Sequence, residues 1–172
     1  MRHILIILPI LLFSPPIFGN NHKAETLYQW GKFPNYKWVG FGDKEEHCVY
    51  KGQVKNGKPH GVGFLECKEW RSKYIGEFKD GLKHGQGKET TLNFYNKPID
   101  IYEGSWDKGY REGKASFIHY YDEYIFVGKF KGGGLFEGTL NTLEGELWCK
   151  LKNSRCLGKN GKRVIGFPRN KN

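Results

Sequence analysis

Aromatic residues and glycines alternate along the middle of this chain in a pattern that occurs four times. Counting an aromatic residue as position 0, glycine occupies +2 and +7 in every copy, and an apolar residue occupies +4. Positions 0, +2 and +4 share one face of an extended strand, and the +7 glycine ends that strand in a turn. Each copy therefore predicts a strand, a tight turn and a second strand. The copies begin at Tyr50, Tyr74, Tyr102 and Phe126.

The first two copies are complete and the last two are degenerate. Glycine also occupies +11 and +13 in the first two, whereas the third copy has Ala115 at +13 and the fourth has Glu137 and Thr139 at these places. Degenerate terminal copies are expected where a stack of repeats must be capped. The residues that we expect to build the repeats are Tyr50, Gly52, Gly57, Gly61, Gly63, Tyr74, Gly76, Phe78, Gly81, Gly85, Gly87, Tyr102, Gly104, Trp106, Gly109, Gly113, Phe126, Gly128, Phe130 and Gly133.

The residues at +6 and +7 predict tight hairpin turns, because they tolerate positive φ angles. A two-residue loop would place position 0 opposite +13 and +2 opposite +11, whereas a four-residue loop would place +4 opposite +11. Both registers put the rings and the glycines on one face, where a ring can cover the bare backbone that glycine leaves. The four turn dipeptides are Asn56-Gly57, Asp80-Gly81, Lys108-Gly109 and Gly132-Gly133.

The pattern aromatic-x-Gly-x-aromatic-x-x-Gly-x-x-x-Gly-x-Gly resembles the MORN repeat and recurs in register from Tyr50 to Thr139. The resemblance implies an all-β fold, an elongated single-layer antiparallel sheet of consecutive MORN-type β-hairpins. It also implies scaffold, oligomerisation or membrane-association roles. We divide the chain into a signal peptide (1–19), an aromatic N-terminal cap or degenerate repeat (20–49), the repeats (50–140), and a C-terminal hairpin with a basic tail (141–172).

The N-terminus predicts export. Met1-Arg2-His3 precedes a ten-residue apolar run, and prolines and a small residue follow it, which is typical of a secretory signal peptide. The run is half the ~20 residues that a membrane-spanning helix needs. We expect cleavage near Gly19-Asn20 and a periplasmic or secreted protein, with an uncleaved anchor as the alternative.

Export favours disulfides over free thiols for the four cysteines. Cys48 and Cys67 flank the first hairpin, and their numbers sum to 115, the sum of directly opposed residues if the loop has four residues. Cys149 and Cys156 could close a second hairpin. Reduced thiols in a chain that stays in the cytoplasm are the alternative. Zinc is not predicted, because the paired close spacing of structural zinc ligands is missing.

The net charge of +10 is concentrated at the C-terminus. Residues 20–146 contain 19 basic and 18 acidic residues, whereas residues 147–172 contain eight basic residues and no acid. Such a segment could attract anionic lipid headgroups or another polyanion. A solvated tail that aids solubility is the alternative, and nucleic acid is not favoured because no recognised binding signature occurs. The candidate binding residues are Lys150, Lys152, Arg155, Lys159, Lys162, Arg163, Arg169 and Lys171.

No cluster of residues predicts catalysis, a metal site or a cofactor. His60 and His84 share position +10 in successive copies, which marks them as turn residues of the repeat. We expect a non-enzymatic interaction or scaffold protein with a protein or envelope partner, and an open sheet edge could also pair with a second copy. The alternative function is a saccharide- or peptidoglycan-binding module that uses the aromatic residues between Tyr28 and Phe41, although these could instead cap the sheet.

Overall fold

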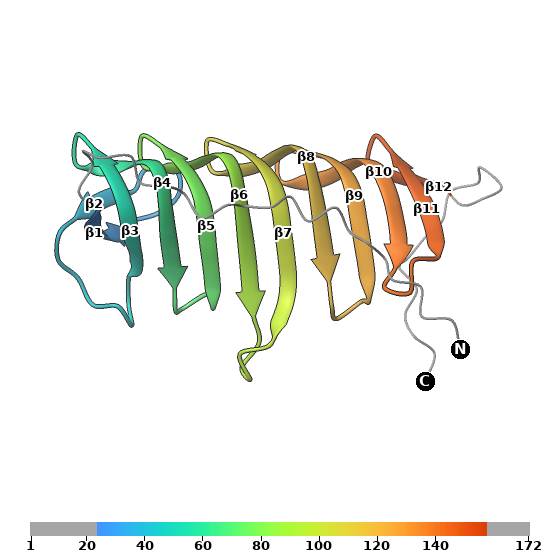
Figure 1. Cartoon of the computed structure of the whole chain (residues 1–172), viewed down its shortest axis with the longest axis horizontal. Helices are drawn as coiled ribbons and strands as arrows, with labels where there is room; N and C mark the ends of the chain where they lie inside the picture. Colours follow the sequence, from blue (N-terminus) through green and yellow to red (C-terminus); the bar gives the residue numbers. More distant parts are fainter. Residues whose placement is uncertain (1–23, 158–172) are drawn as a thin grey trace.

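The computed structural model describes residues 24–157, which form one antiparallel sheet of twelve strands in a single layer (Figure 1). The predicted all-β, single-layer fold of consecutive hairpins is confirmed. The predicted signal peptide lies outside the described residues. No helix within residues 24–157 is long and apolar enough to cross a membrane. The strands are β1 (Glu25–Trp30), β2 (Lys37–Val39), β3 (Cys48–Lys55), β4 (Lys58–Cys67), β5 (Ser72–Lys79), β6 (Leu82–Leu92), β7 (Pro98–Asp107), β8 (Tyr110–His119), β9 (Tyr124–Lys131), β10 (Gly134–Thr142), β11 (Leu147–Lys152) and β12 (Arg155–Leu157).

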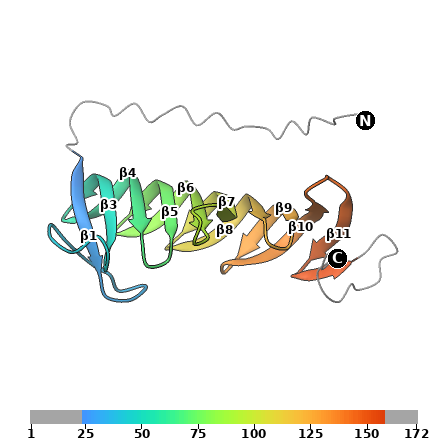
Figure 2. The same ribbon diagram turned by 90° about the horizontal axis from the view of Figure 1, so that it is seen from below.

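The strands lie in chain order from β3 to β12, and the first two strands extend the sheet beyond β3. Strand β1 pairs with β3 on one side and with β2 on the other, so that β2 is the outermost strand. In Figure 2, β1 stands at a steep angle to the strands of the repeats. Twelve strands spaced by ~4.8 Å make a sheet about 50 Å long. The four repeats supply only the eight strands from β3 to β10. Strands β1 and β2 extend the sheet at one end, and β11 and β12 extend it at the other.

Two-residue turns join the strands of each repeat. Asn56 and Gly57 have φ angles of 52° and 70°, so both turn residues are left-handed. The same pair of positive φ angles recurs in the other three repeats. This conformation matches the right-handed twist of the flanking strands, which explains the Asn-Gly and Asp-Gly dipeptides. The predicted strand, turn and strand of each repeat are therefore present.

Neither register that the sequence suggested holds through a whole hairpin. Beside the first turn, Val54 faces Pro59, as a two-residue loop requires. Further along, Gly52 faces Gly63, because a bulge leaves extra residues unpaired on β4. Gly61, at position +11, lies in this bulge with a φ angle of 75°. The prediction that +11 would face +2 or +4 of its own hairpin is therefore wrong.

The side chain at +3 satisfies the backbone of each of the first two bulges. Gln53 Oε1 accepts a hydrogen bond from the N–H of Val62 at 2.9 Å, and Glu77 Oε1 accepts one from the N–H of Gln86 at 2.8 Å. Because buried or strained backbone groups need partners, these bonds stabilise the bulge. The bulge in turn bends the hairpin and brings the residues near the turn over the rings.

Alternation along the strands separates two faces of the sheet. The ring face carries the four position-0 rings, each at most 1% exposed. The outer face carries Phe64, Ile75 and Val127, which lie in register with one another across the sheet. Ile75 and Val127 remain 48% and 49% exposed. The core of this single-layer protein therefore lies on the ring face alone.

Candidate interaction surfaces

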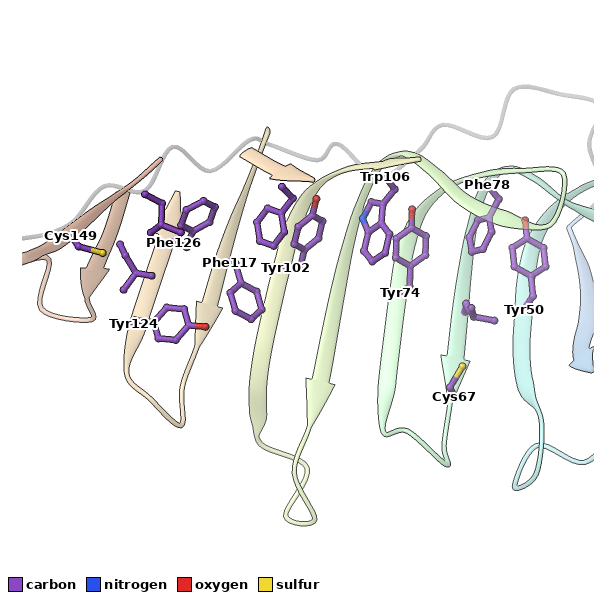
Figure 3. Packing of buried hydrophobic residues seen from close by; sticks show 14 of the residues in the cluster. Tyr50, Cys67, Tyr74, Phe78, Tyr102, Trp106, Phe117, Tyr124, Phe126 and Cys149 are labelled. Carbon is purple, nitrogen blue, oxygen red and sulfur yellow. The ribbon is translucent and has the colours of Figure 1, made fainter. Parts of the chain in front are cut away.

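Each position-0 ring in the interior of the ring face lies between two +4 rings. The centroid of Tyr74 lies 5.1 Å from that of Phe78 in its own repeat and 5.2 Å from that of Trp106 in the next. Tyr102 lies between Trp106 and Phe130 in the same way, at 5.0 and 4.9 Å. These pairs meet edge to face, which contributes about 0.5–1.5 kcal/mol each beyond area burial. The rings form one row across the repeats (Figure 3).

The glycines at +2 and +13 make room for the rings. Gly52 and Gly63 face each other beneath Tyr50, and a Cβ added to Gly52 would lie 2.5 Å from Tyr50 Oη. The same hydroxyl donates a hydrogen bond to the carbonyl oxygen of Gln53 at 2.6 Å. Burial raises the pKa of this hydroxyl, so it stays protonated and able to donate. The ring thus covers the bare backbone of these two glycines, whereas the +11 glycine serves the bulge.

Trp38 extends the ring row at its N-terminal end. The first repeat has Val54 at +4, so Tyr50 lacks one of the two neighbouring rings. Trp38 on β2 supplies a ring 5.9 Å from Tyr50, centroid to centroid. A Cβ added to the turn glycine Gly81 would lie 2.7 Å from Trp38 Nε1. The indole is therefore packed between the first ring and the second turn.

The loop between β1 and β2 continues this cap to the third repeat. A Cβ added to Gly109 would lie 2.5 Å from Phe33 Cε2, and the Phe33 ring packs 5.0 Å from that of Tyr110. Trp30 and Phe41, by contrast, remain 38% and 72% exposed. The aromatic segment is thus divided between rings that cover the sheet and rings that face solvent.

Both predicted disulfides are present. Cys48 and Cys67 join the two strands of the first hairpin, with Cα atoms 4.1 Å apart. Cys149 and Cys156 join β11 and β12, with Cα atoms 5.7 Å apart. The two bonds therefore close the first repeat and the last hairpin of the sheet.

An ionic cluster that the sequence analysis did not predict lies in the centre of the ring face. Lys83 Nζ donates to Glu89 Oε1, and Arg111 Nη2 donates to Glu89 Oε2 at 2.9 Å. The three side chains are only 14–22% exposed. The two cations also lie over rings, within 5.2 Å of the centroids of Tyr74 and Trp106 (Lys83) and of Tyr102 and Phe117 (Arg111).

The charges of this cluster compensate one another. Burial by itself would raise the pKa of the Glu89 carboxyl, but Lys83 and Arg111 outweigh burial and hold the pKa below its ordinary value. Burial also lowers the pKa of the Lys83 ammonium, against the pull of Glu89. Glu89 is therefore the anion that keeps two partly buried cations paired.

Comparison of the copies could have revealed this cluster. Position +15 holds Leu65 in the first repeat but Glu89 in the second, and position +9 holds Pro59 in the first but Lys83 in the second. Glu89 faces the position-0 rings of its own and the next repeat, so its carboxylate lies on the ring face. Glu89 is the one charged residue at +15 among the four copies, and +9 is basic only in the second and third copies, so this local departure from the repeat is the missed signal.

The histidines at +10 link successive turns. His60 Nδ1 lies 3.6 Å from Asp80 Oδ1, and His84 Nδ1 lies 3.3 Å from Asp107 Oδ1. In the third repeat, Glu112 takes this position and accepts a hydrogen bond from the N–H of Gly132 at 2.8 Å. Position +10 therefore ties each of the first three hairpins to the turn of the next one. Among the described residues, no group of three His, Cys, Asp or Glu side chains is arranged to hold a metal ion.

The basic C-terminal segment is only partly described. Lys150, Lys152 and Arg155 are exposed on β11 and β12, and none of them pairs with an acidic side chain of residues 24–157. Lys152 and Arg155 flank the last turn of the sheet. The other five candidate binding residues, Lys159, Lys162, Arg163, Arg169 and Lys171, lie outside the described residues.

Comparison with known proteins identifies the repeats. The MORN repeat profile matches residues 50–70, 74–91 and 102–119. Alsin from Rattus norvegicus is 28% identical over 120 residues, which are 67% of this chain and 7% of alsin. Human alsin is 33% identical over 84 residues, which are 49% of this chain and 5% of alsin. Human ALS2 C-terminal-like protein is 29% identical over 86 residues, which are 50% of this chain and 9% of that protein. The chain spans less than a tenth of these relatives.

Proposed function

Because this chain is a MORN repeat-containing protein, we propose that it is a non-enzymatic, exported interaction scaffold that associates with an anionic membrane or envelope surface. The observation that carries the proposal is the continuous ring row, which joins all four repeats into one extended sheet. Such a sheet holds its exposed outer face at a constant geometry for a partner. The basic segment at its C-terminal end supplies the attachment.

Charge supports the attachment step. The last 26 residues contain eight basic residues and no acid, and Lys152 and Arg155 project from the final turn without an acidic partner among the described residues. Near an anionic surface, each Lys or Arg contributes about 1 kcal/mol, and salt screens this attraction. A disulfide between β11 and β12 holds the start of the segment to the sheet. The sheet would thus follow the tail to the surface.

Co-sedimentation of the full chain with vesicles tests this function. Removal of everything after Glu146 would also delete β11, β12 and one disulfide. Neutralisation of the tail charges instead leaves the described sheet and its disulfide unchanged. The variant carries glutamine in place of Lys159, Lys162, Arg163, Arg169 and Lys171. The matched control carries glutamine in place of five lysines of the outer face, Lys51, Lys73, Lys88, Lys114 and Lys129.

We expect the unchanged chain and the outer-face control to bind phosphatidylserine-containing vesicles at low salt and to be released at high salt. The neutralised variant should bind at least tenfold more weakly, and no form should bind neutral vesicles. Binding that survives neutralisation, or binding to neutral vesicles, would contradict attachment through the tail.

The alternative saccharide-binding function would use the solvent-facing aromatic residues. Trp38 cannot serve as its probe, because the indole packs against Tyr50 in the core. Trp30 and Phe41 are the suitable pair, since both are exposed and their centroids lie 6.4 Å apart. Loss of peptidoglycan binding in a Trp30→Ala, Phe41→Ala variant, unaffected by salt, would favour this function over the envelope-surface scaffold.

A further inference from the structure

The two long edges of the sheet differ in chemistry. The turn row, at the upper edge in Figure 1, consists of residues 55–58, 79–82, 107–110, 131–134 and 152–155. The loop row, at the lower edge, consists of residues 43–47, 68–71, 93–97, 120–123 and 143–146. The near-neutral charge of the repeat region conceals a separation of charge between these rows.

The turn row is cationic. It contains seven basic and two acidic residues, a net charge of +5. The two acids, Asp80 and Asp107, already contact His60 and His84. The seven basic side chains are exposed, and none pairs with an acid within residues 24–157. They are Lys55, Lys58, Lys79, Lys108, Lys131, Lys152 and Arg155.

The loop row is acidic and aromatic. It contains eight acidic and four basic residues, a net charge of −4. It also carries large aromatic side chains that face solvent, in contrast to the buried rings of the ring face. Their exposed fractions are 56% for Trp70, 83% for Phe94, 84% for Tyr95, 42% for Tyr120 and 85% for Tyr121. Exposed aromatic residues of this kind mark interaction surfaces when they gather along one edge.

The two rows have the same period because they belong to one sheet. A turn and a loop each occur once every two strands, so neighbouring turns, like neighbouring loops, lie about 10 Å apart. The axes of the antiparallel strands from β4 to β11 are nearly aligned, and each strand extends from one edge of the sheet to the other (Figure 1). A second copy displaced along the strand direction therefore brings every turn opposite a loop, one strand out of step.

Charge is complementary at both ends of that alignment, whereas the middle loops 68–71 and 93–97 each carry a net charge of +1 and offer aromatic rings in place of acids. Residues 43–47 and 143–146 each have a net charge of −2, and they meet residues 55–58 and 152–155, which each have +2. In the middle, Lys79 meets Trp70, and Lys108 meets the 93–97 loop with its two aromatic residues. A lysine ammonium over an exposed ring is attracted by about 0.5–1 kcal/mol.

We propose that copies of this chain associate side by side, with the turn row of one copy against the loop row of the next. The contact is heterologous, so it leaves one unused row on each end and builds open chains of sheets. It does not involve the terminal strands β2 and β12, which are only three residues long and offer few free backbone groups. It shares only Lys152 and Arg155 with the attachment proposed for the C-terminal tail, and the substitutions that test the two proposals leave both of these residues unchanged.

Sedimentation velocity on the full chain and two variants tests the proposal. The turn-row variant carries Lys79→Glu, Lys108→Glu and Lys131→Glu, and the loop-row variant carries Trp70→Ser, Tyr95→Ser and Tyr121→Ser. All six side chains are exposed, so both variants should melt at the temperature of the unchanged chain. The matched control, Lys51→Glu, Lys114→Glu and Lys129→Glu, makes the same charge change on the outer face.

We expect the average mass of the unchanged chain and of the control to rise with concentration and to fall with salt. Each row variant alone should sediment as a single chain. An equal mixture of the two should sediment at twice that mass and no more, because only one complementary pair of rows remains.

Several results would overturn the proposal. One is an unchanged chain that sediments as a single chain at every concentration and salt level, a result that needs no variant. Another is a turn-row variant that still self-associates. This result would show that the C-terminal tail, and not the turn row, supplies the positive charge in the contact between copies. A mixture that stays at single mass would show that the rows contact other partners, such as an anionic surface or a basic protein.

Discussion

The N-terminal end and the centre of the ring face are closed by different chemistry on the same backbone. In the first repeat, Pro59 and Leu65 cover the ring and a disulfide joins the strands. In the second repeat, Lys83 and Glu89 occupy the same two positions, and Arg111 completes their charge balance. The hairpin register is the same in both repeats, including the bulge. Rings and glycines therefore set the geometry, while positions +9 and +15 need only fill the space and leave no charge unpaired.

The two regions contribute to stability in different ways. The apolar end gains directly from burial, at roughly 25 cal/mol per Å² of apolar surface. The ionic centre must first desolvate three charges, so its attraction largely offsets its own cost. The centre is therefore sensitive to the loss of any one member, although it adds little net stability as a whole.

Replacement of Glu89 by glutamine should have the largest effect. It leaves Lys83 and Arg111 partly buried without an anion, which costs about 3 kcal/mol when one partner of a buried pair is removed. Urea unfolding of the variant at neutral pH measures the loss. In the triple variant Glu89→Leu, Lys83→Leu and Arg111→Leu, which imitates the apolar end, stability should return to that of the unchanged chain or exceed it. A triple variant as unstable as the single one would show that the ions do more than fill space.

Removal of the disulfides should rank next and should differ between the two ends. Cys48 and Cys67 are 19 residues apart, whereas Cys149 and Cys156 are 7 apart. The loop-closure estimate gives about 3 kcal/mol for the longer loop and about 1 kcal/mol less for the shorter one. Paired Cys→Ala variants, compared by thermal unfolding, measure the difference. Equal losses at both ends would mean that strain or residual structure outweighs loop length.

Acid should weaken the centre more than the apolar end. The pKa of Glu89 is lowered in the folded state, so its stabilisation is complete above the unfolded pKa of about 4.3 and is lost as pH falls through the folded value. Unfolding free energy measured from pH 7 to pH 3 should therefore fall less in the triple leucine variant than in the unchanged chain. Identical pH profiles would argue against a charged Glu89 in the native protein.

The smallest effect should come from the histidine links. His60 near the end and His84 in the centre make the same contact with the next turn, and both are about one-third exposed. Exposed pairs contribute 0–1 kcal/mol, so alanine at either position should cost about 0.5 kcal/mol. Two equal and small losses would confirm that the end and the centre differ at +9 and +15 and not at the turns. A large loss at His84 alone would show that the two regions also differ at their turns.

Local chemistry explains which features could be predicted. Asn56-Gly57 and Asp80-Gly81 predict turns with positive φ angles, since few other residues adopt that conformation without strain. The parity of Tyr50 and Gly52 places ring and glycine on one face, because side chains alternate along a strand. The positions of Cys48 and Cys67 on either side of the first hairpin similarly predicted their pairing, although their register comes from the bulge and not from a four-residue loop. Each of these depends only on residues within one hairpin.

The features that escaped prediction depend on contacts that strand alternation does not reveal, and two of them depend on more than one repeat. The bulge at Gly61 lies within the first hairpin, where the Gln53 side chain accepts a hydrogen bond from the N–H of Val62 on the neighbouring strand. The Glu89 cluster needs cations from two repeats. Trp38 belongs to the ring row only because β2 and the loop before it lie against the first ring and the turns of the next two repeats.

The repeat pattern by itself determined the all-β class, the hairpin turns, the ring and glycine face and the disulfide pairs, because all of these follow from short-range backbone geometry. Tertiary structure alone decided how the repeats meet. It placed rings of successive repeats edge to face and brought charged side chains of two repeats together in the centre of the ring face. It also placed the positive and negative charges of a near-neutral region along opposite edges of the sheet. These outcomes depend on which side chains become neighbours across strands, and that requires the register that the bulges set.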